Sequence, residues 1–140
     1  MSCGSVGVNG DGTDLAIVSY ANGFDLSSQA EKVLREQHDI ACRIIDIRWL
    51  APLPEDVIVD ATAGCNHVLI VDECRSTGSQ GEALMTLFAE KSNHSAVRLV
   101  AKDSFIPTGP PMVRPCRAEM AWSVPLWRCS IRKNQGIRCK

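Results

Sequence analysis

Four short apolar segments that alternate with amphipathic segments constrain the fold of this 140-residue chain more than any other feature. The apolar segments are rich in β-branched residues, as buried strands usually are, and they cover residues 14–20, 41–50, 67–72 and 96–101. Apolar residues recur at helical spacing between them, over residues 25–37, 54–64 and 77–91. This alternation over short connections favours an α/β fold, in which helices cover both faces of a mostly parallel sheet.

The distribution of charge divides the chain near residue 110. Residues 1–110 contain eight Lys or Arg and fifteen Asp or Glu, whereas residues 111–140 contain seven Lys or Arg and a single acidic residue, Glu119. Prolines also interrupt any regular periodicity in the last segment. We therefore predict three parts: a flexible N-terminal lead over residues 1–13, an α/β domain over residues 14–110, and a basic tail over residues 111–140 that is disordered or frame-shifted.

Neither the cysteines nor the histidines form a recognisable metal site. No two cysteines form a C-x-x-C pair and no two histidines form an H-x-x-x-H pair. These residues are Cys3, Cys42, Cys65, Cys74, Cys116, Cys129 and Cys139, with His38, His67 and His94. We therefore predict reduced thiols and no metal-binding residue in this chain.

The segment after the third predicted strand is the strongest candidate for a functional site. It lies where a parallel strand ends and a helix begins, and ligands of open α/β sheets bind at such carboxyl ends. Arg75 precedes a glycine-containing turn, which suits either an anion site or an interface loop. The adjacent Asp72 and Glu73 suit either proton transfer in a cleft or pairing at an interface.

Several motifs in series resemble the C-terminal domain of transketolase-like, thiamine-diphosphate-dependent enzymes. The most specific is IDIRWLAPL at residues 45–53, which resembles "IDLRTLxPLD" in the β-type chain of 2-oxo acid dehydrogenases. VLIVDE at residues 68–73, followed by STGSQG at residues 76–81, resembles "VVVEE...TGGxG". Further similar segments, in the family's order, are residues 14–23, 97–100 and 105–110.

This resemblance implies a three-layer α/β/α fold whose five-stranded sheet contains one antiparallel strand. The family's final helix has no recognisable counterpart after residue 110. In the family, thiamine diphosphate and Mg²⁺ bind between other domains, and the C-terminal domain builds the dimer and helps to dock an acyltransferase core. Gly10-Asp11-Gly12 precedes its strand and lacks the Asn that completes the family's metal motif, so we interpret it as a plain turn. The resemblance carries over no catalytic or cofactor-binding residue to this chain. It carries over the segment at residues 48–53 and the loop at residues 73–81 as packing and interface elements. The residues that we single out there as an interface or anion loop are Arg48, Pro52, Asp72, Glu73, Arg75, Thr77, Gly78 and Gly81.

We therefore predict an assembly and dimerisation domain of a thiamine-dependent 2-oxo acid dehydrogenase component, a fragment that needs partner domains for oxidative decarboxylation. Expected partners are the thiamine-binding domains or subunit, an acyltransferase core and a second copy of this chain. Two other hypotheses stay open: a standalone anion-binding α/β domain, and a nucleic-acid-binding protein whose basic tail interleaves Arg with Trp122 and Trp127. No apolar run approaches the roughly 18 residues of a membrane span, and no secretory signal is recognisable, so we predict a cytoplasmic protein.

Overall fold

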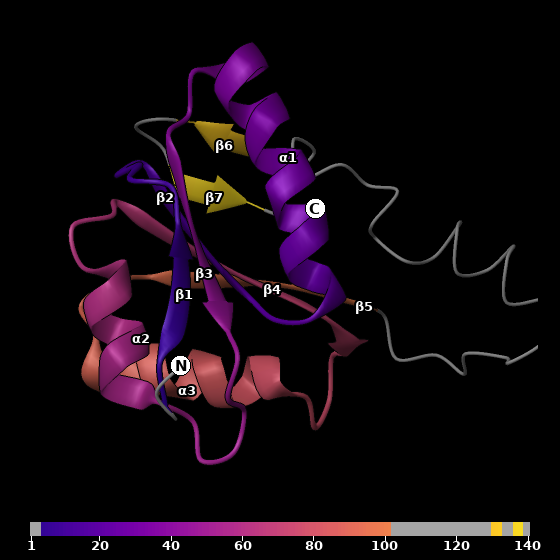
Figure 1. Ribbon diagram of the computed structural model, residues 1–140, viewed down its shortest axis with the longest axis vertical. Coiled ribbons are helices and arrows are strands. Elements are labelled where there is room, and N and C mark those ends of the chain that lie inside the picture. Colours follow the sequence, from indigo (N-terminus) through magenta and orange to yellow (C-terminus); the bar gives the residue numbers. More distant parts are fainter. Residues whose placement is uncertain (1–3, 102–129, 133–135, 139–140) are drawn as a thin grey trace, which may run out of the picture.

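The computed structural model describes residues 4–101, 130–132 and 136–138 of the chain (Figure 1). The strands of the main sheet are β1 (Val6–Asn9), β2 (Leu15–Ser19), β3 (Cys42–Ile47), β4 (His67–Arg75) and β5 (Ala96–Ala101). The helices are α1 (Asn22–His38), α2 (Glu55–Thr62) and α3 (Gln80–Lys91).

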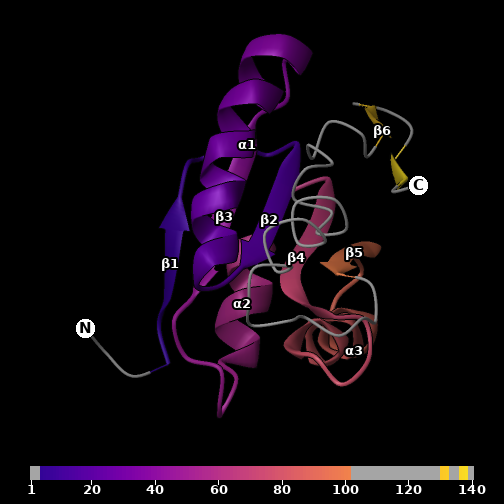
Figure 2. The same ribbon diagram turned by 90° about the vertical axis from the view of Figure 1, so that its right-hand side faces the viewer.

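The main sheet has the strand order β1-β3-β2-β4-β5. β2 pairs in parallel with β3 and β4, and β4 pairs in parallel with β5, whereas β1 runs antiparallel to β3. Figure 2 shows β1 at one edge of the sheet and β5 at the other. The prediction of an α/β fold with a mostly parallel five-stranded sheet and one antiparallel strand is therefore confirmed.

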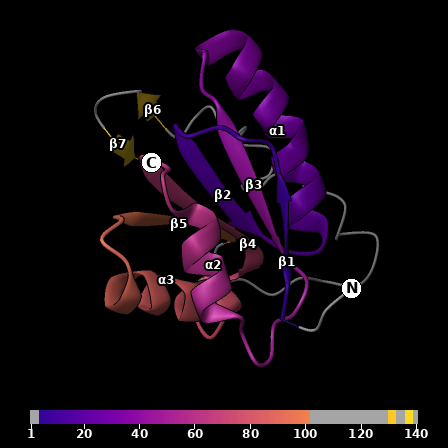
Figure 3. The same cartoon turned by 60° about the vertical axis from the view of Figure 1, so that its left-hand side comes forward.

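Helices cover both faces of this sheet and give the molecule three layers. α1 lies on one face, and α2 and α3 lie on the other (Figures 1 and 3). Successive residues of β2 alternate between the two layers: Leu15 and Ile17 pack in the cluster under α1, and Ala16 and Val18 pack in the cluster under α2 and α3. Burial of each such aliphatic side chain stabilises the folded state by about 1.5–3 kcal/mol. The strands that appear in the sequence as continuous apolar runs therefore hold both helical layers on the sheet.

β1 is a correction to the predicted boundaries. The sequence suggests a flexible lead over residues 1–13, but Val6–Asn9 pairs with β3 from Ile47 to Ile44. The strand was missed because it is four residues long and half exposed, so it shows no apolar run. The chain then turns sharply into β2: Gly10 has a φ of 83°, and a Cβ on Gly12 would lie 2.3 Å from the carbonyl carbon of Ala41. Glycine is required at position 10 by the positive φ and at position 12 by the close approach of the Ala41 backbone.

Two helices begin elsewhere than the sequence predicts. α1 starts at Asn22, three residues before the predicted Asp25, after Ala21 adopts a left-handed φ of 49°. α3 starts at Gln80 instead of residue 77, because β4 continues to Arg75 and a turn through Gly78, with a φ of 70°, follows it. The boundaries shift where local backbone geometry, not apolar periodicity, decides them.

Part of the predicted tail has regular structure. β6 (Ser130–Arg132) and β7 (Gly136–Arg138) pair in an antiparallel two-stranded sheet. The predictions of disorder over the rest of the tail, of a missing final helix and of a nucleic-acid-binding face lie outside the described residues. Among the residues that the structure describes, no helix is both long and apolar enough to cross a bilayer.

Candidate interface at the carboxyl end of the sheet

The carboxyl ends of β2, β3 and β4 lie at the same end of the sheet because the three strands are parallel. We call this end the carboxyl edge, as distinct from the edge strands β1 and β5. The chain leaves β2 into α1 on one face and leaves β4 toward α3 on the other, so β2 and β4 form the topological switch point of the sheet. Open α/β sheets place their functional residues outside this point. The predicted residues Asp72 to Gly81 follow β4 here, and Arg48 and Pro52 follow β3.

Asp72 is the centre of this edge. Its side chain is 1% exposed, yet both carboxylate oxygens accept hydrogen bonds. Oδ1 accepts from the Tyr20 hydroxyl at 2.6 Å and from the Cys74 amide at 2.9 Å, and Oδ2 accepts from the Gly81 amide at 2.7 Å. Burial by itself raises the pKa of Asp72, but the hydrogen bonds outweigh it and hold the pKa below its usual value. Asp72 is therefore a buried carboxylate that stays ionised.

Tyr20 donates to this carboxylate and does not ionise. Burial raises the pKa of the Tyr20 phenol far above its usual value, and the hydrogen bond to Asp72 raises it further. A phenol that cannot deprotonate and a carboxylate that is difficult to protonate make a poor acid–base pair. The arrangement instead joins β2 to β4 and to the first turn of α3, which is a structural function.

Gly81 permits this close packing. A Cβ at position 81 would lie 2.9 Å from Oδ2 of Asp72 and 2.9 Å from Cδ of Arg98 on β5. Any larger residue would push the helix away from the carboxylate and lengthen the hydrogen bond from the Gly81 amide. Gly81 therefore serves the contact between α3 and the sheet.

The turn before α3 offers little to an external anion. The Gly78 amide already donates to the carboxylate of Glu82 at 2.8 Å, as the Cys74 and Gly81 amides do to Asp72. Arg75 is exposed, and its Nε donates to the carbonyl of Thr77 at 3.0 Å, while Glu73 accepts from Asn22 at 3.1 Å. The amides that would bind a phosphate have acidic partners within the chain, which favours the interface hypothesis over the anion hypothesis.

The segment after β3 lies beside this turn. Nε2 of Gln80 donates to the carbonyl oxygen of Leu50 at 3.3 Å, which joins the segment to the start of α3. Nε of Arg48 pairs with Asp46 at 2.8 Å, and Pro52 follows a cis peptide bond. Between them, Trp49 is 42% exposed and Leu50 is 39% exposed. The structure thus brings the predicted residues of both segments to one edge, where an aromatic and an aliphatic side chain face solvent.

Sequence reasoning missed Tyr20, whereas it included Trp49 and Leu50 in the predicted interface segment 48–53 and Gln80 in the predicted loop 73–81. Tyr20 ends an apolar strand, and the polar tip of an aromatic residue at a strand end is the signal that would have identified it. The contact between Gln80 and Leu50 carries no such signal, because it joins residues 30 apart in the chain.

The described residues contain no cluster of side chains typical of a metal site. They include no group of three or more His, Cys, Asp or Glu side chains that could hold a metal ion. Asp11 lies in the connection between β1 and β2, exposed, and not beside Asp72. Because Asp72 has no free oxygen facing solvent and the nearby amides are paired, these residues do not fit Mg²⁺ or a diphosphate.

The strand order and the antiparallel edge strand define a three-layer α/β domain with a mostly parallel five-stranded sheet. A model of the family described as "Transketolase, C-terminal domain" matches residues 4–115, and the chain belongs to this family. The match includes β1, which extends the family region beyond the predicted start at residue 14.

The chain is similar to part of each of three curated relatives. The chain is 31% identical over 108 residues to 1-deoxy-D-xylulose-5-phosphate synthase of Halalkalibacterium halodurans, covering 76% of this chain and 17% of the relative. It is 26% identical over 115 residues to 3-methyl-2-oxobutanoate dehydrogenase subunit beta of Mycobacterium tuberculosis, covering 82% of this chain and 32% of the relative. It is 27% identical over 62 residues to the mitochondrial pyruvate dehydrogenase E1 component subunit beta of Saccharomyces cerevisiae, covering 44% of this chain and 17% of the relative. The chain thus spans less than a third of the length of each.

Solved structures share the fold. A split-gene transketolase described as an inactive beta4 tetramer superposes with a TM-score of 0.73 at 22% identity, over 88% of this chain and 40% of that chain. The 2-oxoglutarate:ferredoxin oxidoreductase of Magnetococcus marinus superposes with a TM-score of 0.55 at 17% identity, over 78% of this chain and 18% of that chain. At these identities the superpositions establish the fold alone.

Proposed function

We propose that this chain is the C-terminal assembly domain of a thiamine-diphosphate-dependent 2-oxo acid dehydrogenase component and does not carry catalysis by itself. Two features at the carboxyl end of the sheet carry the proposal. The oxygens of Asp72 are hydrogen-bonded inside the domain, and Trp49 and Leu50 on the adjoining segment are exposed. The ionisable side chain at this end of the sheet is thus bonded within the domain, and the side chains exposed beside it are apolar, as is typical of an interface.

The composition of the edge fits a protein partner. Interfaces are enriched in aromatic residues and Arg and have a polar rim around an apolar centre. Here Trp49 and Leu50 supply the apolar centre, and the exposed Arg48 and Arg75 supply charged groups for the rim. The hydrogen bonds of Asp72 to Cys74 and Gly81 hold the loop before α3, and the bond from Gln80 to the Leu50 carbonyl joins the segment after β3 to that loop. Both segments are thus ordered before a partner arrives, which lowers the entropy lost on binding.

The comparisons support a role inside a larger assembly. Two relatives are named as beta subunits, and the first solved relative is named as a tetramer that is inactive. Carried to this chain, these names suggest that it assembles without catalysing a reaction. Thiamine diphosphate, Mg²⁺ and the catalytic residues of oxidative decarboxylation would be supplied by other domains or subunits, because the described residues fit neither group. An acyltransferase core and a second copy of this chain are further expected partners.

A second candidate for the parent enzyme is a 1-deoxy-D-xylulose-5-phosphate synthase. The 31% identity to the Halalkalibacterium halodurans enzyme favours it. The IDIRWLAPL segment, with its resemblance to the β-type chains, favours the dehydrogenase. Both candidates give this domain the same assembly role, and they differ in the substrate of the completed enzyme.

The test is the assembly state of the full chain purified from its own source cells, by sedimentation and by mass spectrometry of the chains that accompany it. We expect a dimer or a stoichiometric complex with a thiamine-binding chain, and we expect Trp49→Asp with Leu50→Asp to dissociate it. Val8→Asp is the matched control, because Val8 is 55% exposed but lies on the edge strand β1, outside both interface segments. A monomer without such a companion, or a complex that tolerates the double substitution, would refute the proposal.

A further inference from the structure

The amino end of β3 borders a cavity that the assembly role does not use. Its volume is about 280 Å³, and it lies between α1, the end of β1 and the start of β3. The nearly buried Cys42 and Ile44 of β3 form its floor, with exposed fractions of 4% and 2%. This volume is close to the lower end of the roughly 300–1,000 Å³ of small-molecule sites, so the cavity suits a small ligand.

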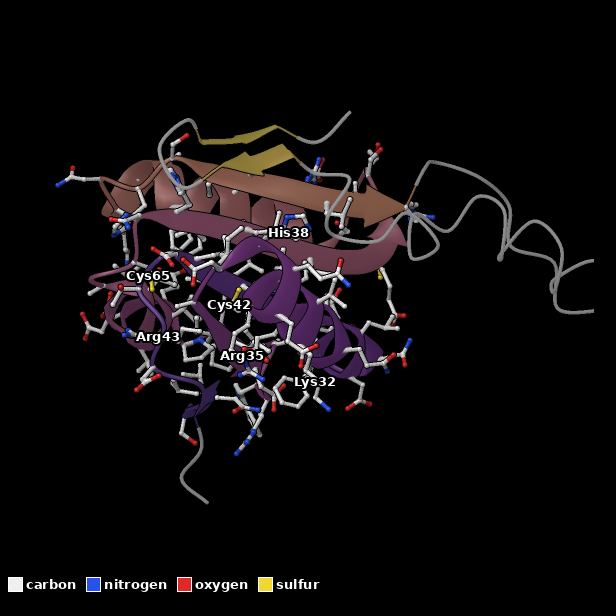
Figure 4. All side chains as sticks on the ribbon, turned by 90° about the horizontal axis from the view of Figure 1, so that it is seen from above. Lys32, Arg35, His38, Cys42, Arg43 and Cys65 are labelled. Carbon is white, nitrogen blue, oxygen red and sulfur yellow. The ribbon has the colours of Figure 1, made fainter. Side chains whose placement is uncertain are left out.

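The wall that α1 contributes is positively charged. Figure 4 shows Lys32 and Arg35 on the same side of α1, and both line the cavity together with Cys42. Glu31, the carboxylate of this wall, pairs with Nη1 of Arg35 at 2.8 Å and leaves the other nitrogens of that guanidinium available. Lys32 has neither a hydrogen bond nor an ion pair with any other described residue. The wall therefore carries one net positive charge, which favours an anionic group.

The opposite wall is neutral and closely fitted. Asn9 and Gly10 form it where the chain leaves β1. Gly10 has a φ of 83°, and a Cβ there would lie 2.8 Å from the carbonyl oxygen of Cys42, so this turn approaches the floor as only glycine allows. The Asn9 amide adds hydrogen-bonding groups at the rim. Asp14, another carboxylate of this region, accepts from the Ala41 amide at 2.9 Å and is thereby held at the connection to β3.

We propose that this cavity binds a small organic anion, with its anionic group at Lys32 and Arg35 and a short apolar body against Cys42 and Ile44. The cavity lies at the amino end of β3, and the interface segments follow the carboxyl ends of β3 and β4. It therefore shares no residue with the proposed interface segments. The inference does not rest on the proposed assembly role, and either can fail without the other.

The test is a titration of the ¹⁵N-labelled full chain with phenyl phosphate, followed by the backbone amide shifts. We expect saturable shifts centred on residues 28–35 and 42–44. Phenol lacks the charge and inorganic phosphate lacks the apolar body, so each should bind at least about fivefold more weakly. Lys32→Ala should weaken phenyl phosphate binding about fivefold to tenfold through loss of a charge-assisted contact, and Lys32→Arg should restore it to within about twofold.

The control is Lys91→Ala, which removes an exposed lysine of α3 that pairs with Glu55 and Asp56 on the other face of the sheet. It should leave phenyl phosphate binding unchanged. Equal binding of inorganic phosphate, or unchanged binding by Lys32→Ala, would show general ion attraction and overturn the proposal. Shifts centred on residues 75–81 would overturn it as well and would instead support an anion site before α3.

Discussion

Replacing Asp72 with asparagine keeps the size of this buried side chain but removes its charge and turns one acceptor into a donor. In the native protein the two oxygens face three donors, from Tyr20, Cys74 and Gly81. The new NH₂ group must face the Gly81 amide or the Tyr20 and Cys74 donors, so at least one buried donor loses its acceptor. Leaving one such group unsatisfied costs about 1–3 kcal/mol.

We therefore expect Asp72→Asn to lower the free energy of unfolding by about 2 kcal/mol, and the melting temperature by about 8–16 °C for a domain of this size. Chemical denaturation followed by circular dichroism measures the first quantity, and calorimetry measures the second. Asp56→Asn is the matched control, because that carboxylate is 86% exposed and should change stability by less than about 0.5 kcal/mol.

A double-mutant cycle with Tyr20→Phe then isolates the 2.6 Å hydrogen bond between the phenol and the carboxylate. Hydrogen bonds to charged groups contribute about 1.5–3 kcal/mol, so the two substitutions together should cost clearly less than the sum of their separate costs. Additive effects, or an Asp72→Asn protein as stable as the native one, would refute the argument that this carboxylate joins β2, β4 and α3.

Three further predictions follow from the same structure. Because the pKa of Asp72 is lowered on folding, the unfolded chain binds more protons; stability should fall as the pH drops from about 4 through the folded pKa, and Asp72→Asn should flatten this part of a pH–stability curve. Gly81→Ala should cost about 1–3 kcal/mol in denaturation experiments because its Cβ would lie 2.9 Å from Oδ2 of Asp72, while Ala83→Gly, at an exposed site of α3, should cost about 1 kcal/mol through helix propensity alone. Burial raises the pKa of the Cys42 thiol to about 12, so peptide mapping after brief iodoacetamide treatment at pH 8 should find Cys74, which is exposed, labelled well before Cys42; equal labelling would contradict the packing of α1 on β3.

Most of the fold could be predicted because its central strands are buried on both faces. Ile17 and Leu69 meet the layer of α1 while their neighbours Val18 and Ile70 meet the layer of α2 and α3, so each strand appears in the sequence as an unbroken apolar run. β1 lacks this signal because it pairs on one side only and leaves Val8 exposed. Its existence depends on a partner strand that lies about 40 residues further along the chain, at Ile44 to Ile47.

The candidate site was predictable in part for a related reason. Asp72, Gly78 and Gly81 follow a strand directly, so their place at the carboxyl edge comes from chain order alone. Tyr20 reaches Asp72 across 52 residues, and no periodicity within either segment shows that contact. The same contact weighs against proton transfer by Asp72, because this carboxylate is buried and accepts three hydrogen bonds from within the domain.

The two ends of the β3 strand therefore differ in what they offer to other molecules. At the carboxyl end, the Gly78 and Gly81 amides already donate hydrogen bonds to acidic side chains of the domain. The exposed side chains beside them are Trp49 and Leu50. At the amino end, Lys32 stands without a carboxylate partner among the described residues, over a cavity with an apolar floor. Apolar surface drives association with another protein, whereas an unneutralised charge above a small cavity selects a small anion. Because the parallel register keeps these ends apart, Trp49→Asp with Leu50→Asp should abolish assembly without weakening phenyl phosphate binding, and Lys32→Ala should do the reverse.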